Sequence, residues 1–153
     1  MREQIVREHI KKWLEKRWKQ AVREDEKYVD YRLVELYPRE RISPDETWLV
    51  NIEAVECKGT GSGVHRAIGQ CLDYYMEYGC IPLYLAVPAD YTKLSSLDRI
   101  MGFYDLPLGI LTVNEEGEIS VRRKAVGKKR YFKRFWKGDH YTNRENYYQL
   151  RAV

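Results

Sequence analysis

The run TWLVNIEAVECKG, residues 47–59, constrains the fold most, because it places two opposite charges at the end of an apolar segment. Its Trp, Leu, Val and Ile residues predict a buried β-strand. Glu56 and Lys58 are two residues apart, so on a strand their side chains point to the same face. Charges near a core must be paired, solvated or bound to a metal. The pair therefore predicts a polar site in which Glu56 can hold a divalent cation and Lys58 can stabilise charge on a phosphate.

Hydrophobic periodicity and turn residues divide the rest of the chain into helical and strand segments. In chain order, we predict a helix over 4–22, a hairpin of strands over 28–38 and 47–59, a helix over 64–79 ended by Gly79, a strand over 81–91 parallel to the Glu56 strand, a short helix over 92–105, and a hairpin over 108–124 that turns at Glu116 and Gly117. This order predicts an α/β sandwich around a mixed sheet. We expect one domain over 1–153, with a basic, aromatic C-terminal extension at about 122–153.

The composition is that of a folded protein, since 33% of the residues are charged and 13% are aromatic. No apolar run approaches the roughly 18–20 residues of a membrane helix, so we expect no membrane partner. The first residues, MREQIVREHIKKW, contain no signal-peptide core. Three cysteines, Cys57, Cys71 and Cys80, form no CxxC pair and leave an odd count. These features predict a cytoplasmic protein with reduced thiols.

A strongly basic segment lies near the C-terminus. Residues 122–137 hold nine of the 27 Lys and Arg residues and no acid, so the rest of the chain has 18 basic and 23 acidic residues and a net charge of −5. Aromatic residues interleave with these cations, which favours nucleic-acid contact because rings stack on bases while cations meet phosphates. The predicted nucleic-acid-binding residues are Lys128, Lys129, Arg130, Lys133, Arg134, Phe135 and Trp136. A solvated basic face is the alternative.

The predicted hairpin indicates which carboxylate lies beside Glu56. Opposite residues of an antiparallel pair have a constant index sum, so a turn centred near Ser43 places Asp30 opposite Glu56. Two carboxylates this close repel each other unless a proton or cation lies between them, and Mg²⁺ prefers one or two carboxylates plus waters and phosphate oxygens. Asp30 is therefore the predicted first metal ligand. Asp45, in a Pro-Asp dipeptide, is the second choice, and a register shift would instead bring Glu35 close.

The order of an acid, Glu-x-Lys and a glycine loop resembles the PD-(D/E)XK nuclease superfamily. In GQCLDYY, Gln70 and Tyr74 lie at i and i+4 on one face of the following helix, which is similar to the Gln-x-x-x-Tyr motif of the RecB-like branch. The resemblance covers residues 30–74. It implies a restriction-endonuclease-like α/β/α sandwich with a central mixed β-sheet flanked by helices.

The resemblance also implies an activity and a site. The activity is that of a deoxyribonuclease dependent on Mg²⁺ or Mn²⁺, with DNA as its partner. The implied catalytic residues are Asp30, Glu56, Lys58, Gln70 and Tyr74. Asp30, Glu56 and the backbone carbonyl of Cys57 would hold the metal. Three cysteines are too few, and unsuitably spaced, for the four-cysteine iron–sulfur cluster of some RecB-like nucleases, so we predict no cluster.

Several interpretations stay open at the level of the sequence. Asp30, Glu56 and Lys58 could form a structural ion-pair network, and Gln70 with Tyr74 could belong to an amphipathic helix that packs a Tyr. His9, on the first helix, matches the metal-bound histidine of some RecB-like nucleases loosely, and packing is the favoured interpretation. The functional rivals are a non-catalytic nucleic-acid-binding protein on the same fold and a homodimeric DNA-junction resolvase. The form of the DNA, RNA as the substrate, and endo- or exonuclease action are left open.

Overall fold

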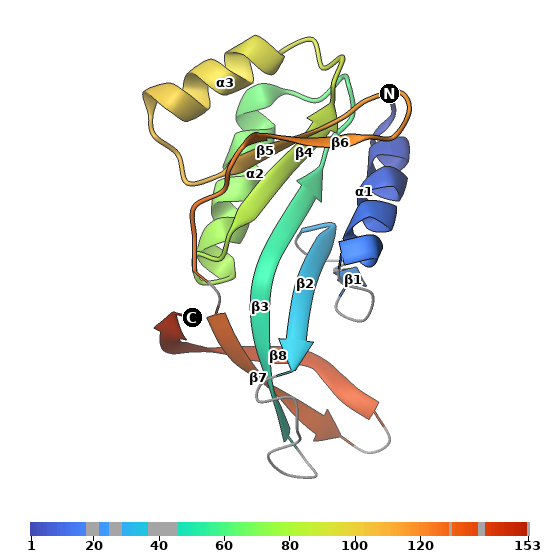
Figure 1. The fold of residues 1–153 in the computed structure, drawn as a ribbon. Helices are drawn as coiled ribbons and strands as arrows, with labels where there is room; N and C mark the ends of the chain where they lie inside the picture. Colours follow the sequence, from blue (N-terminus) through green and yellow to red (C-terminus); the bar gives the residue numbers. More distant parts are fainter. Residues whose placement is uncertain (18–21, 25–28, 37–45, 129, 138–139, 153) are drawn as a thin grey trace.

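The protein is an α/β protein in which helices flank a mixed sheet, as the computed structural model shows (Figure 1). It describes residues 1–17, 22–24, 29–36, 46–128, 130–137 and 140–152, with the backbone alone for residue 23 and for 34–36, 46–50, 130–137 and 140–152. The elements are α1 (Glu3–Arg17), β1 (Val22–Glu24), β2 (Tyr31–Leu36), β3 (Glu46–Cys57), α2 (Val64–Glu77), β4 (Leu83–Pro88), α3 (Leu94–Phe103), β5 (Gly109–Val113), β6 (Ile119–Arg123), β7 (Arg130–Lys137) and β8 (His140–Ala152). Among the described residues, no helix is both long and apolar enough to cross a membrane.

The sheet has the strand order β1-β2-β3-β4-β5-β6, and its centre is parallel. β3, β4 and β5 run in the same direction, connected by α2 and α3, while β2 pairs with β3 and β6 with β5 in antiparallel fashion. Right-handed crossovers between successive neighbouring strands place both connecting helices on one face of the sheet. The predicted hairpin over the first two strands and the predicted parallel strand after the second helix are confirmed.

Two hydrophobic layers cover the two faces of the sheet. One layer packs α2 and α3 against residues such as Ala54 and Leu85, and the other packs α1 against residues such as Val55 and Cys57. Because successive side chains of a strand point to opposite faces, Glu56 lies on the face that α2 covers. The sheet therefore positions the acidic residue of Glu-x-Lys next to the helix that carries Gln70 and Tyr74.

The ends of two helices test the predicted boundaries. α2 ends as predicted, because Tyr78 is its C-cap and Gly79 takes the left-handed conformation, with φ 75°. The predicted first helix was too long, since α1 ends at Arg17 and Val22 begins strand β1. Val22 is opposite Leu33 in that strand and packs on the α1 layer. Val22 has helical spacing in the sequence, but it is β-branched, and pairing with β2 makes it part of the sheet.

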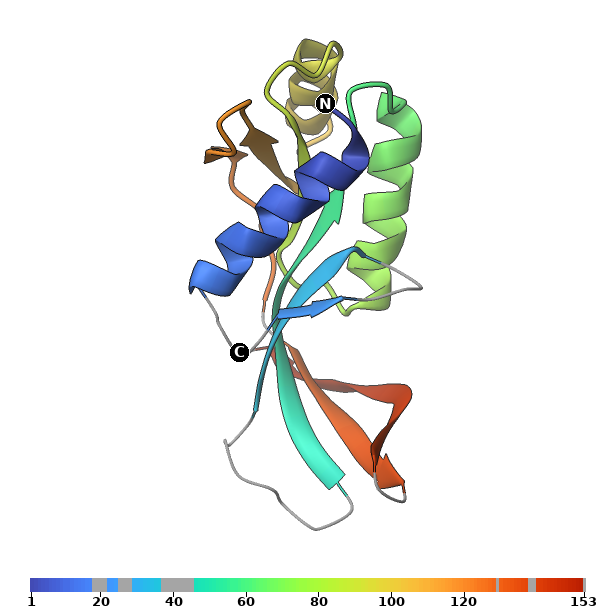
Figure 2. The same ribbon diagram turned by 90° about the vertical axis from the view of Figure 1, so that its right-hand side faces the viewer.

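The C-terminal segment completes the lower part of the sheet in Figures 1 and 2. The first two basic residues of the 122–137 tract belong to β6, whose hairpin with β5 turns at Gly117, φ +80°, as predicted. Residues 130–137 form β7, which pairs with β8 and with the first half of β3. β4 pairs with the second half of β3. Strand β7 and Glu56 therefore lie at opposite ends of the long strand β3.

Candidate metal centre

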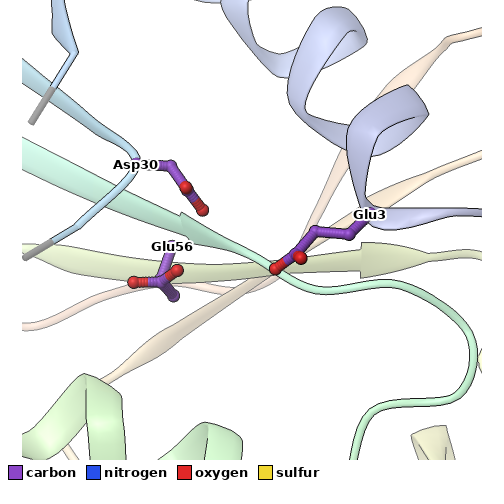
Figure 3. A group of neighbouring side chains, drawn as sticks. All are labelled: Glu3, Asp30 and Glu56. Carbon is purple, nitrogen blue, oxygen red and sulfur yellow. The ribbon is translucent and has the colours of Figure 1, made fainter. Parts of the chain in front are cut away.

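Three carboxylates from three elements converge where β3 ends. Glu3 comes from the first turn of α1, Asp30 directly precedes β2, and Glu56 is the second-last residue of β3. One oxygen from each lies within 4.8 Å of the others, and the side chains approach one another in Figure 3. The proximity of Asp30 and Glu56 agrees with the prediction from the sequence. Glu3 is an addition that the sequence analysis missed.

The strand register explains why Asp30 reaches Glu56. Tyr31 is opposite Val55, so Asp30, one residue earlier, lies beside Glu56, one residue later. The alternative Glu35 is excluded, because its backbone is opposite Val50, six residues along β3 from Glu56. Six residues of strand span about 20 Å. The other alternative, Asp45, lies outside the described residues.

Asp30 is held by one hydrogen bond and one ion pair. The backbone N–H of Cys57 donates to its Oδ2 at 2.7 Å, and Nε of Arg7 lies 3.3 Å from its Oδ1. The N–H and C=O of one strand residue point to the same edge, so the Cys57 carbonyl is expected on the edge that Asp30 occupies. The Cys57 side chain is buried in the α1 layer. Its thiol therefore serves packing, while its backbone belongs to the carboxylate cluster.

Glu56 is buried, with 5% of its surface exposed, and its Oε2 has no hydrogen-bond partner among the described residues. Burial raises the pKa of Glu56 to about 9, and the neighbouring carboxylates of Asp30 and Glu3 act in the same direction. The Lys58 ammonium opposes this rise, since its Nζ lies 3.9 Å from an oxygen of Glu56. The same Nζ lies 3.9 Å from Glu3, so Lys58 adjoins the cluster, as predicted.

Helix α2 faces the same cluster. Burial is the main cause of the raised pKa of Tyr74, and the neighbouring Glu56, Cys71 and Asp30 act in the same direction. Gln70, one turn earlier, has a buried Oε1 without a hydrogen-bond partner in the described part of the chain. Tyr74 also packs against the α2 and α3 layer, as the amphipathic-helix interpretation expects. The two interpretations of this pair are therefore compatible.

Other predicted residues lie away from the cluster. The His9 ring lies against the β5–β6 turn, where a Cβ added at Gly117 would be 2.5 Å from its Nδ1. This agrees with the packing interpretation and excludes His9 from the cluster, whose α1 members are Glu3 and Arg7. Glu3 and Arg7 are four residues apart, so they share one face of α1, and His9 does not lie on that face.

The basic tract is remote from the carboxylates. Lys128 is exposed, its backbone N–H donates to the Cys80 carbonyl, and Lys129 lies outside the described residues. Arg130, Lys133, Arg134, Phe135 and Trp136 are in β7. Arg130 is opposite Asn51 and Phe135 is opposite Glu46, five and ten residues along β3 from Glu56. Those intervals correspond to about 17 Å and about 33 Å of strand.

Contacts between the N-terminus and the loop after Lys58 position Glu3. The Met1 amine donates to Thr60 Oγ1 at 2.6 Å, and the Thr60 N–H donates to the Met1 carbonyl at 3.0 Å. Gly59 allows the close approach, because a Cβ there would lie 2.7 Å from the backbone nitrogen of Glu3. The only signal for Glu3 in the sequence is an acid one turn before Arg7 on the first helix. Such a pair is too common to indicate a site.

A comparison of this chain with protein-family models, curated proteins and solved structures finds no match. The chemistry of the donors is therefore the basis of the assignment. Three carboxylates and a strand carbonyl are hard oxygen ligands, which Mg²⁺ and Mn²⁺ prefer. Zn²⁺ more often binds thiolate and imidazole ligands. The Oε2 of Glu56, which has no partner in the described part of the protein, and the crowding of three acids fit a divalent cation.

Proposed function

We propose that this protein is a metal-dependent nuclease that hydrolyses phosphodiester bonds of DNA by a PD-(D/E)XK mechanism on a restriction-endonuclease-like fold. One observation carries the proposal. Three carboxylates converge within 4.8 Å, and the Lys58 ammonium lies 3.9 Å from two of them. Carboxylates that collect a divalent cation beside a lysine provide the charge arrangement that phosphodiester hydrolysis requires.

Asp30, Glu56 and Glu3 would hold Mg²⁺ or Mn²⁺, with the Cys57 carbonyl on the same edge. When bound, such an ion supplies Lewis-acid stabilisation of the phosphate and lowers the pKa of a coordinated water. Arg7 and the Cys57 N–H fix the Asp30 carboxylate, so that its orientation is set before the substrate binds. Pre-orientation of this kind removes the need to reorganise charged groups during the reaction.

Lys58 and the α2 residues would act on the substrate. The Lys58 side chain is 16% exposed, so its ammonium can meet a phosphate while its stem stays packed. It would neutralise charge that develops on the phosphate or hold the attacking water. The Gln70 amide and the Tyr74 hydroxyl would line the site from α2. The Oε1 of Gln70, which has no partner among the described residues, can accept a hydrogen bond.

A structural ion-pair network is the simplest rival interpretation. Such a network pairs each buried carboxylate with a donor, because an unpaired buried charge is costly. Asp30 meets this condition through Arg7 and Cys57, whereas Glu56 has a raised pKa and leaves one buried oxygen without a partner among the residues that the structure describes. This favours a ligand site over a self-satisfied network. It also favours turnover over a non-catalytic binding protein, for which a convergence of acids has no use.

The test is incubation of the purified protein with linear, circular and single-stranded DNA, and with RNA, in Mg²⁺, in Mn²⁺ and in EDTA. We expect cleavage only with a divalent ion. Glu56→Ala and Lys58→Ala should abolish cleavage while DNA binding is largely retained, because these residues act on the reacting phosphate. Glu8→Ala, an exposed acid on α1 outside the cluster, is the control and should cut like the wild type. Cleavage at the wild-type rate by both site variants would refute the assignment.

A further inference from the structure

A hollow of about 480 Å³ lies between the beginnings of α2 and α3. Its lining carries the cationic side chains of Arg66, Lys93 and Arg99 and the imidazole of His65. The remaining lining residues are Gly63, Val64, Ser96 and Ile100, so none of the eight is acidic. Positive groups gathered around a concave surface raise the local concentration of anions.

His65, Arg66 and Lys93 lie at helix N-termini, where positive charge is unfavourable for folding. His65 and Arg66 are in the first turn of α2, and Lys93 is the N-cap of α3. Helix N-termini carry partial positive charge and favour Asp, Glu, Ser or Asn. Neither helix has an acid in its first turn or a side-chain cap hydrogen bond. The hollow therefore gathers two helix N-termini and three cationic side chains. An anion is the ligand that would be complementary to all of them.

The hollow adjoins the carboxylate cluster. Both helices begin where β3 and β4 end, at the top of the molecule in Figures 1 and 2, together with the N-terminus. Loop 59–63 separates the two features, since Glu3 and Gly59–Ser62 line a depression on one side and Gly63 lines the hollow on the other. The Tyr91 hydroxyl donates to the Ser62 carbonyl at 2.5 Å, which ties the segment leading into α3 to this loop.

We infer that the hollow binds a backbone phosphate of the nucleic acid, next to the phosphodiester that the carboxylate cluster acts on. The inference rests on the proposed nuclease function and extends it by naming where the substrate is held. Arg66 and Arg99 present planar donors that match phosphate oxygens, and Lys93 adds a point charge. The remote β7 strand would contact the nucleic acid elsewhere along its length.

The test compares two triple variants with the wild type. Arg66→Gln/Lys93→Gln/Arg99→Gln neutralises the hollow, and Lys11→Gln/Lys12→Gln/Lys16→Gln removes the same charge from α1, outside the hollow and outside the basic tract. Binding of a fluorescent 20-base-pair DNA duplex is measured by anisotropy in EDTA at several salt concentrations. Each lost phosphate contact flattens the slope of log affinity against log salt by roughly 0.9. Because the hollow is inferred to hold one phosphate, we expect a slope reduced by about 0.9 for the hollow variant and nearly unchanged for the control variant.

Cleavage in Mg²⁺ separates this inference from the proposed function. The hollow variant should show a raised KM and a wild-type kcat, because its residues hold the substrate and do not touch the reacting phosphate. If the wild type binds DNA with the expected dependence on the hollow but never cuts, the phosphate site stands and the nuclease proposal fails. If the wild type cuts and the hollow variant keeps both the salt slope and the KM, the inference is wrong and the nuclease proposal stands.

Discussion

Glu56 is the most buried carboxylate of the cluster. A carboxyl group that is 5% exposed, beside two other carboxylates, is easier to keep protonated than ionised in the metal-free protein. Its pKa of about 9 describes that state. A cation in the cluster would displace the proton, so metal affinity should rise with pH.

The dependence of stability on pH gives a prediction for Glu56. Between pH 5 and 8 the folded state keeps a proton that the unfolded carboxylate releases, so the Glu56 contribution to the free energy of unfolding falls as pH rises, by about 1.4 kcal/mol per unit. Glu56→Gln removes this contribution. In EDTA, urea denaturation should show that the variant gains stability relative to the wild type as pH increases. A constant difference between the two proteins across this range would mean that Glu56 is ionised in the folded state.

At pH 8, addition of the metal should instead favour the stability of the wild type over that of Glu56→Gln. A ligand that binds only the folded state stabilises it by about 2.7 kcal/mol at 100 times its Kd. Mg²⁺ or Mn²⁺ should therefore raise the Tm of the wild type and leave the Tm of Glu56→Gln unchanged. Thermal unfolding with and without the ion measures this, and Ca²⁺-free buffers avoid competition. Equal shifts for the two proteins would place the ion elsewhere.

At the scale of elements, α2 and α3 combine poor capping with a basic hollow. Lys93→Asp places a favoured residue at the N-cap of α3, where a cation lies now. We expect a gain of about 0.5–1 kcal/mol in the free energy of unfolding, together with weaker DNA binding. Urea denaturation and anisotropy on the same preparation measure both. Loss of stability would show that Lys93 has a structural role in its present position.

The strands and helices also show which features of the fold could be predicted from the sequence. The β2–β3 register near the cluster was predicted because turn residues and a constant index sum fix an antiparallel pair, and Tyr31 opposite Val55 agrees with it. The bulge between Leu33 and Val34 shifts the register beyond that point, and no residue in the segment indicates it. Glu3 was missed because its position depends on contacts of Met1 with Thr60, 59 residues away. Contacts of that kind follow from tertiary packing and leave no local pattern.

At the scale of the whole molecule, the charges are divided between the two ends of β3. The carboxylates and the basic hollow lie at one end, and the basic tract of β7 lies along the other. The fold of this tract was not predicted, because its alternation of cations and aromatic residues serves equally as a strand or as a solvated surface. In the structure, residues 130–137 pair with β3 and therefore form a strand.

This separation predicts different effects for the two basic regions. Neutralising Lys128, Lys129, Arg130, Lys133 and Arg134 together should weaken binding to all DNA sequences and flatten the salt slope, while cleavage at saturating DNA survives. If the rings of Phe135 and Trp136 stack on bases, replacing them should weaken single-stranded binding more than duplex binding. Anisotropy at several salt concentrations measures both effects. An unchanged salt slope in the neutralised variant would make the tract a solvated surface.

The binding of Mn²⁺ tests the central claim most directly, because it requires the cluster alone and no knowledge of the substrate. The electron paramagnetic resonance signal of free Mn²⁺ is followed during titration into wild-type protein, Glu56→Gln and Glu53→Gln at pH 8. Glu53 is the matched control, since it is an acid on the same strand that pairs with Arg17 at 3.2 Å and lies outside the cluster. We expect that the wild type and Glu53→Gln bind Mn²⁺ and that Glu56→Gln does not. Equal binding by all three proteins, or no binding by the wild type, would contradict it.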